Sequence, residues 1–326
     1  MSILGKFLRG PAPAAAPAPE LAELARHVAE LERTLGRLYQ IACLRLDMHT
    51  AQELRALLAD PRYGAPGRLE RHGFKVWSQN DEDGILEEIF RRIGAVSRTF
   101  VEFGVSEGRE CNTLKLLVEG WRGLWMESLP QHCAHLRRIH AAALAEGRLE
   151  LLETAVDAEN IDQLVAGAKV AAGGELDLLS IDIDGNDYYV LKALRSVRPR
   201  VLVIEFNGKF PPPMDVVPPY DTKRFWDGSD YGGASLQAIA NLAARKGYRL
   251  VGTNITGVNA FFVREDLAGG KFAAGSVAEL YNPARIWLTP GYSAGHPAGE
   301  RFHYLSDAAL ERGPTPERAP GGGGQE

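Results

Sequence analysis

The chain has 326 residues, of which 45% are hydrophobic and 24% are charged, values typical of a globular protein with room for one large domain and an appendage. Its net charge of −5 argues against nucleic acid as a partner. Three cysteines without a Cys-x-x-Cys pair favour reduced thiols and a cytoplasmic location, and no apolar run is long enough for a transmembrane segment.

Two different patterns make up the N-terminal region. We expect residues 1–19 to form a flexible N-terminus. Residues 11–19 consist of proline and alanine, a composition typical of an extended linker. From residue 20 onward, apolar residues recur every three or four positions, the pattern of one long amphipathic helix. They are Leu21, Leu24, Val28, Leu31, Leu35, Leu38, Ile41 and Leu44. This helical arm, residues 20–73 with its closing turns, either pairs with a second copy as a coiled coil, giving a homo-oligomer, or packs on its own chain.

A second helix is predicted to begin at Ser78, which would cap it, with acidic residues filling its first turns. Strand and helix patterns then alternate. The predicted strands are residues 100–103, 123–127, 149–153, 176–183, 201–206, 248–253 and 259–263, and the helices between them are residues 110–119, 130–145, 161–168, 187–193 and 235–246. This alternation predicts an α/β domain over residues 74–312, with a mostly parallel sheet covered on both faces. Residues 313–326 are rich in proline and glycine and are expected to be a disordered tail.

A glycine loop follows the strand at residues 100–103. Gly104 and Gly108 allow the backbone to turn tightly and to approach a ligand, and the next strand ends at Glu127, where nucleotide-binding folds place a carboxylate for a ribose. The loop lacks the third glycine of dinucleotide enzymes and any Gly-Lys-Ser/Thr phosphate cradle. Because Glu102 would repel a pyrophosphate, the pattern favours a cationic cofactor without phosphate, and S-adenosylmethionine (SAM) fits that description.

Acidic and amide side chains end two neighbouring predicted strands. Asp182 and Asp184 come at the end of one strand, and Glu205 and Asn207 at the end of the next. The carboxyl ends of parallel strands meet at the crevice where open α/β sheets bind ligands. There these groups could coordinate Mg²⁺ or Mn²⁺, act as a general base, or hold the ammonium group of SAM. The structural alternative is that Asp184 only caps the following helix.

A long loop over residues 210–233 comes next and is rich in aromatic residues. Loops of this length are usually lids or binding loops. Aromatic side chains with polar neighbours suit a sugar or another polyhydroxylated ring, although they could instead pack against the arm. The candidate substrate-binding residues are Lys209, Tyr220, Trp226 and Tyr231.

Taken in order, the segments 78–83, 101–104, 180–185 and 204–206 resemble the FkbM-type branch of class I SAM-dependent methyltransferases, and the resemblance covers about residues 77–263. It implies a seven-stranded, doubly wound, Rossmann-like sheet and O-methylation of a hydroxyl on a small molecule or glycan. The implied cofactor-binding residues are Gln79, Asp83, Glu102, Gly104, Ser106, Gly108, Asn112, Glu127, Ser128, Ala155, Asp157 and Asp182. The implied catalytic residues are Asp182, Asp184 and Glu205, and the metal candidates are Asp184, Glu205 and Asn207.

The chain departs from the commonest FkbM pattern at two points, Asp184 in place of glutamate and the additional Asn186-Asp187. These departures leave the acceptor class and the need for a metal open. Two functions therefore stand at this stage. One is an O-methyltransferase acting on a saccharide, glycan or natural product, and the other is a non-catalytic scaffold protein with a SAM-binding fold that oligomerises through its arm.

Overall fold

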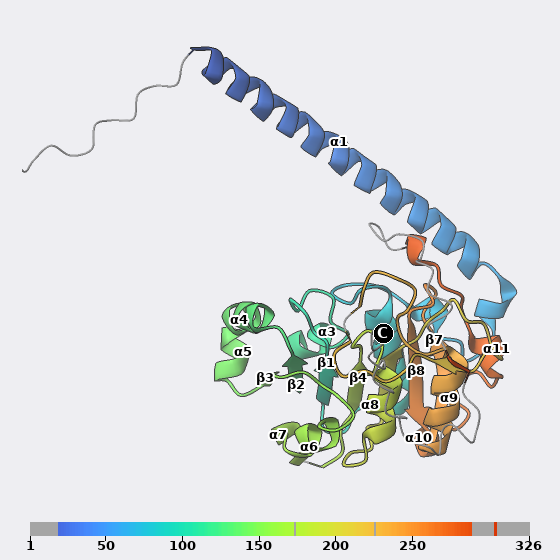
Figure 1. Cartoon of the computed structure of the whole chain (residues 1–326). Coiled ribbons are helices and arrows are strands. Elements are labelled where there is room, and N and C mark those ends of the chain that lie inside the picture. The colour runs from blue at the N-terminus through green and yellow to red at the C-terminus, as the bar shows by residue number, and fades with distance from the viewer. Residues whose placement is uncertain (1–18, 173, 225, 289–302, 305–326) are drawn as a thin grey trace, which may run out of the picture. The chain divides into compact units, whose positions relative to one another are not determined.

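The computed structural model describes residues 19–172, 174–224, 226–288 and 303–304 (Figure 1). The chain divides into two units, Met1–Gln52 and Glu53–Glu326. Most of the predicted flexible N-terminus and all of the predicted tail, residues 313–326, lie outside the described residues. None of the described helices is long and apolar enough to cross a membrane.

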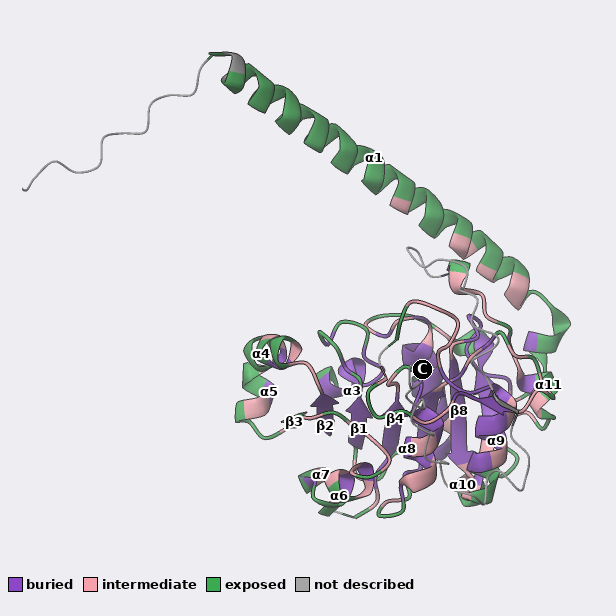
Figure 2. Ribbon diagram, viewed as in Figure 1, coloured by how far each residue is buried: buried purple, intermediate pink, exposed green. Residues whose placement is uncertain are grey.

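The predicted arm is a single helix, α1 (Pro19–Leu58), of 40 residues. Its apolar stripe is open to solvent along most of its length, as Figure 2 shows in green. Leu31 and Leu35, for example, are each 68% exposed. The last turns differ, because Leu54, Leu57 and Leu58 pack against a small cluster of the second unit. The helix is therefore confirmed, whereas its pairing with a second copy stays a prediction.

The second unit contains a seven-stranded sheet in the order β3-β2-β1-β4-β5-β8-β7. Its strands are β1 (Thr99–Phe103), β2 (Arg122–Glu127), β3 (Leu149–Glu153), β4 (Leu178–Ile181), β5 (Val201–Glu205), β7 (Tyr248–Thr253) and β8 (Asn259–Arg264). Strands β1 to β5 are parallel, and β8 runs antiparallel to both β5 and β7. A two-stranded ribbon pairs β6 (Val216–Val217) with β9 (His303–Tyr304). This confirms the predicted α/β, doubly wound, mostly parallel, seven-stranded Rossmann-like sheet.

Alternation along the strands supplies two apolar cores, one on each face of the sheet. In β5, Val201 and Val203 enter one core, whereas Leu202 and Ile204 enter the other. The helices of this unit are α2 (Glu82–Ile93), α3 (Leu114–Val118), α4 (Pro130–Ile139), α5 (Ala141–Ala145), α6 (Ile161–Ala166), α7 (Lys169–Ala172), α8 (Asp187–Ala193), α9 (Leu236–Arg245), α10 (Glu265–Ala268) and α11 (Val277–Leu280). Short 3₁₀ helices cover η1 (Pro61–Gly64), η2 (Glu70–His72) and η3 (Ile286–Leu288).

Some helix bounds differ from the sequence predictions, and for α2 a buried carboxylate explains why. Helix α2 begins at Glu82 instead of Ser78, because Asp83 folds the preceding residues into a turn by accepting hydrogen bonds from the backbone of Val76, Trp77 and Ser78. The helix predicted over residues 110–119 begins only at Leu114. The one predicted over residues 130–145 is divided into α4 and α5.

Candidate active site

A cavity of about 540 Å³ opens at the carboxyl ends of the parallel strands. It lies where the strand order reverses between β1 and β4, the position at which open α/β sheets bind ligands. Eight of the predicted cofactor residues lie in its wall: Gln79, Gly104, Ser106, Asn112, Glu127, Ser128, Ala155 and Asp182. The structure therefore brings together residues from the end of β2, from the loops that follow β1, β2, β3 and β4, and from the segment before α2.

Gly104 is required by the close approach of two strand ends. Its φ is +79°, and a Cβ there would lie 1.6 Å from the backbone oxygen of Asp182. Two residues with side chains also have a positive φ near the cavity, Ser106 at 50° and Asp184 at 55°. Such conformations carry strain and gather at functional sites, so both loops at this cavity have a backbone that the fold must hold in place.

Glu127 connects the glycine loop to the start of α4. One of its carboxylate oxygens accepts from the backbone N–H of Ser106 at 2.7 Å, and the other accepts from the N–H of Leu129 at 2.9 Å. Each oxygen has a second lone pair, so the carboxylate can still accept hydrogen bonds from a ribose. Its place in the cavity wall fits the predicted role as ribose ligand.

Four predicted cofactor residues do not line the cavity: Asp83, Glu102, Gly108 and Asp157. Glu102 accepts from the backbone N–H groups of Asn112 and Thr113 and from the hydroxyls of Thr113 and Ser180, and burial raises its pKa to about 7. Its carboxylate thus fixes the loop behind the cavity. Asp157 similarly holds a turn by accepting from the backbone of Glu159 and Asn160.

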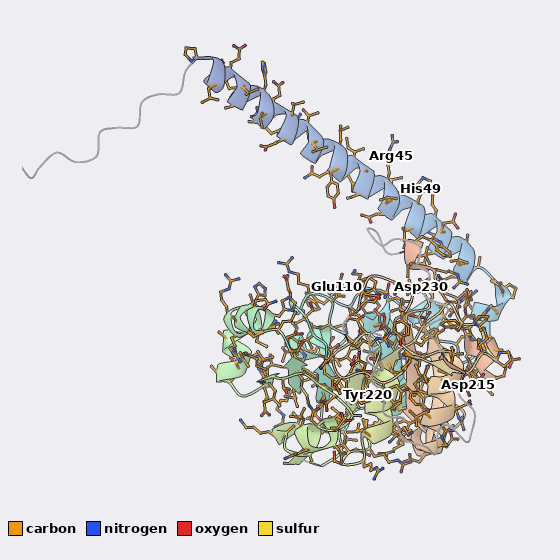
Figure 3. The ribbon with its side chains drawn as sticks, viewed as in Figure 1. Arg45, His49, Glu110, Asp215, Tyr220 and Asp230 are labelled. Carbon is orange, nitrogen blue, oxygen red and sulfur yellow. The ribbon has the colours of Figure 1, made fainter. Side chains whose placement is uncertain are left out.

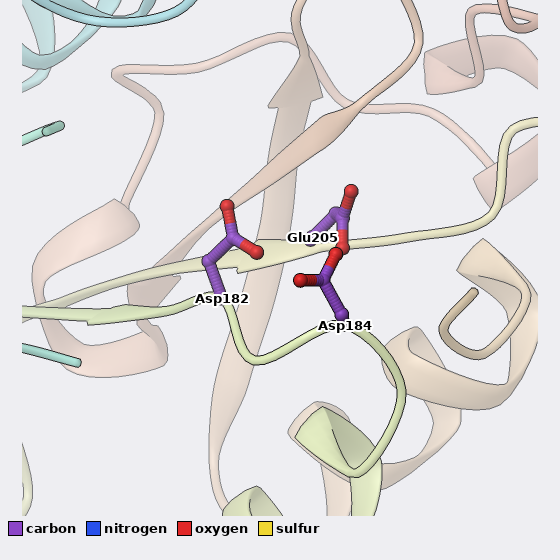
Figure 4. Close-up of side chains that lie close together, drawn as sticks. All are labelled: Asp182, Asp184 and Glu205. Carbon is purple, nitrogen blue, oxygen red and sulfur yellow. The ribbon is translucent and has the colours of Figure 1, made fainter. Parts of the chain in front are cut away.

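Three carboxylates in the wall of the cavity lie close together, and Figure 4 shows them side by side. One oxygen each from Asp182, Asp184 and Glu205 can be chosen so that all three lie within 4.8 Å of one another. Asp182 and Glu205 are half-buried, whereas Asp184 is exposed to the cavity. The register explains the convergence, because Asp182 and Glu205 each follow directly on the last pair of the β4–β5 ladder, Ile181 and Ile204.

The surroundings favour the neutral forms of these acids. Burial, followed by the charge of Asp184, raises the pKa of Asp182 well above its ordinary value. Burial and then the charge of Asp182 do the same to the pKa of Glu205. The pKa of Asp184 is raised to about 6, by desolvation and then by Asp187, while Arg224 opposes the shift. The cluster would therefore be stabilised by a bound cation or a proton.

The sequence left open that Asp184 only caps the helix that follows it. In the structure, Asp187 stabilises the start of this helix instead. Its carboxylate accepts from the backbone N–H groups of Ile183 and Gly185, both at 2.8 Å, and so closes the turn before α8. Arg224 covers this turn, since a Cβ on Gly185 would lie 2.4 Å from its Nε. The side chain of Asp184 consequently stays directed at the cavity.

A second cavity, of about 590 Å³, meets the first at three shared residues, Asp184, Glu205 and Trp226. Its wall also includes Asn207, Lys209, Asp230, Tyr281 and Trp287. The amide nitrogen of Asn207 donates to the carbonyls of Asp230 and Gly232, and its oxygen accepts from the backbone N–H of Lys209 at 3.2 Å, so both ends of this predicted metal ligand are engaged with the loop. Lys209 pairs with the carboxylate of Asp230.

The predicted substrate residues separate into two groups. Lys209 and Trp226 line the second cavity, whereas Tyr220 and Tyr231 do not. Tyr220, labelled in Figure 3, donates to the carboxylate of Glu159 and accepts from the N–H of Ala158, which anchors the long loop. The ring of Tyr231 lies under the guanidinium of Arg224, 3.8 Å from it.

Several residues of this site were not identified from the sequence. Asn259 lines the first cavity and Tyr281 and Trp287 line the second, yet all three are far along the chain from the motifs. Arg224 also lines the first cavity, but it is not among the substrate-binding residues predicted for the long loop. Only the antiparallel placement of β8 beside β5, which no local pattern reveals, brings Asn259 to the site.

No protein-family model and no curated protein matches this chain. Among solved structures it is similar to the glycopeptide N-methyltransferase MtfA complexed with S-adenosyl-L-homocysteine (SAH), with 15% identity, a TM-score of 0.35, and 55% of this chain and 86% of that chain covered. It is also similar to an O-methyltransferase family protein from Burkholderia thailandensis (17%, TM-score 0.34, 54% and 52% covered). A third is the N-terminal domain of EvdMO1 with SAH bound (12%, TM-score 0.36, 59% and 88% covered). Likenesses this distant do not assign an activity.

Proposed function

We propose that this protein is a cytoplasmic, FkbM-like SAM-dependent O-methyltransferase that acts on a hydroxyl of a saccharide, glycan or natural product. The observation that carries the proposal is the junction of two cavities at Asp184 and Glu205. The first cavity suits SAM, since Glu127 offers a carboxylate to the ribose and the acidic wall suits a sulfonium and an ammonium. The second cavity, with Trp226 in its wall, suits a cyclic acceptor with hydroxyl groups.

In this arrangement methyl transfer needs positioning and deprotonation more than activation, because SAM already carries a good leaving group. The acceptor oxygen attacks the methyl carbon, the bond from that carbon to sulfur breaks, and the hydroxyl proton passes to a carboxylate. The products are SAH and a methyl ether. Asp184 suits the role of base, since its pKa of about 6 leaves it largely ionised at neutral pH.

Isothermal titration of the full-length protein with SAM tests the first step. We expect one site per chain, with SAH competing for it. If the folded protein binds neither compound, the proposed function is wrong. If it binds SAM but transfers no labelled methyl group to glycan or metabolite extracts, the non-catalytic scaffold is the better account.

We also propose that α1 pairs in parallel with α1 of a second copy. Six apolar residues fit heptad a and d positions, and each is between 45% and 68% exposed: Leu21, Leu24, Val28, Leu31, Leu35 and Leu38. In a parallel pair this register places His27 at position g beside Glu32 of the other helix at position e, which gives opposite charges when the histidine is protonated.

Sedimentation velocity tests the pairing. Leu31→Asn should convert the protein to a monomer, whereas Glu30→Gln, on the outer face of the helix, should leave the assembly unchanged. A chain beginning at Glu53 keeps the leucines that pack on the second unit, so it should be a monomer with SAM affinity intact. A wild-type protein that sediments as a monomer would contradict the pairing.

A further inference from the structure

One residue in the wall of the first cavity, Asn259, has a buried side-chain oxygen, Oδ1, without a hydrogen-bond partner among the described residues. The residue is only 2% exposed. Its amide nitrogen donates to Glu82 at 2.9 Å, and because a carboxylate accepts only, this fixes which end of the amide carries the oxygen. A buried acceptor without a donor is costly unless something supplies positive charge or a proton.

The sheet places this oxygen beside the three carboxylates. Asn259 is paired directly opposite Glu205 in the antiparallel β5–β8 ladder, so both side chains leave the same face of the sheet. Asp182 continues the row on the other side of Glu205, one position beyond the last β4–β5 pair. Asp182, Asp184, Glu205 and Asn259 all line the same cavity.

The position of Asn259 is itself held by a second layer. Glu82 is fully buried and also accepts from the side-chain amides of Asn80 and Asn254. Asn254 in turn accepts from the backbone N–H of Asn259 through its own Oδ1, at 3.0 Å. The amide oxygen is thus presented by a preformed network, as ligands to metals commonly are.

We propose that Asp182, Asp184, Glu205 and Asn259 form a binding site for a divalent cation, Mg²⁺ or Mn²⁺. Three carboxylates and one amide oxygen are hard ligands, which suit these ions better than Zn²⁺ or Cu²⁺. The set replaces the ligands predicted from the sequence, since Asn207 is engaged with its loop and Asn259 takes its place. Four protein ligands leave octahedral positions open toward the junction of the two cavities. If the methyltransferase proposal also holds, an acceptor oxygen bound there would be deprotonated more easily.

Electron paramagnetic resonance of Mn²⁺ tests the site in the full-length protein without any need for activity. We expect one bound Mn²⁺ per chain, displaced by excess Mg²⁺. Asp184→Asn should abolish the binding, and Asn259→Ser should weaken it by about tenfold or more. The matched control is Asn80→Ser, which also removes an amide donor to Glu82 but lies outside the cavity wall, and which should keep the wild-type affinity.

Two outcomes would overturn the cation site. One is no Mn²⁺ binding by folded wild-type protein, with or without SAH. The other is equal weakening by Asn259→Ser and Asn80→Ser, which would mean that only the buried network was disturbed. Titration with SAM, run in parallel without metal, separates this inference from the proposed function: Mn²⁺ binding without SAM binding would keep the site and reject the methyltransferase, and the reverse result would do the opposite.

Discussion

This protein has two groups of acidic side chains, and the groups differ in what surrounds their carboxylates. Glu70 and Glu82 are fully buried, but each is surrounded by donors: Arg68, Leu69 and Asn282 for the first, and the amides of Asn80, Asn254 and Asn259 for the second. Asp182, Asp184 and Glu205 instead face a cavity and have raised pKa values. The density of acidic residues therefore does not mark a site; a lack of internal donors does.

We call the acids that face the cavity, Asp182, Asp184 and Glu205, the open group, and the acids surrounded by donors, Glu70 and Glu82, the closed group. The largest difference in activity should appear when one acid of the open group is neutralised. Asp184→Asn keeps the size of the side chain, and asparagine tolerates the positive φ of 55°. Without its carboxylate, we expect methyl transfer to fall by roughly 10²–10⁴-fold, while the free energy of unfolding should not fall, because the neutral amide removes a charge that the surroundings disfavour. Initial rates and urea unfolding of the same preparation measure both. A variant that unfolds instead would show that the open group is structural.

Removing one acid of the closed group should instead lower stability. Glu82→Ala leaves the buried amides of Asn80, Asn254 and Asn259 without an acceptor, so we expect the free energy of unfolding to fall by about 3 kcal/mol or more. Glu87→Ala on the same helix removes an exposed carboxylate from Lys115, which still pairs with Glu119, and should cost less than about 1 kcal/mol. If the two variants unfold at the same urea concentration, Glu82 has no special role.

Glu127 lies between these extremes, because it holds backbone donors and also faces the cavity. Glu127→Ala should weaken SAM binding by roughly 1–3 kcal/mol, the range for unmatched buried hydrogen-bond partners. Titration calorimetry measures the change. Glu153→Ala is the matched control, since Glu153 also ends a strand but pairs with Arg137 at the surface, and its affinity for SAM should equal that of the wild type.

The last effect depends on pH and concerns Asp81, an acid beside Glu70 and Glu82. Burial, together with the charges of Glu82 and Glu70, raises the pKa of Asp81 to about 8. The fold therefore prefers the neutral acid, and its contribution to stability is complete below pH ~4 and is lost as pH rises through about 8. Asp81→Asn should reduce this loss, so that Tm changes less between pH 5 and pH 8.5. A wild-type Tm that rises over that interval would contradict the assignment.

The sequence predicts the sheet well and the site only in part, for a physical reason. Strand spans follow from local apolar patterns, and β3, β7 and α8 begin and end where predicted. The acids at the ends of β4 and β5 follow from the same patterns. Whether an acid faces a ligand depends on donors that return from elsewhere in the chain. Glu102 accepts hydrogen bonds from backbone N–H groups ten and eleven residues later and therefore does not face the cavity. Asn259 lies at the site because β8 is inserted between β5 and β7 in the sheet.

The wall common to the two cavities has a consequence for inhibitor design. Because Asp184, Glu205 and Trp226 border both spaces, one molecule can fill both at once. An adenosine unit in the first cavity and a ring in the second would be joined by a short linker passing the carboxylates. A protonated amine in that linker would meet the acids where the methyl group is transferred. Such a bisubstrate compound would gain affinity from linking two weak binders.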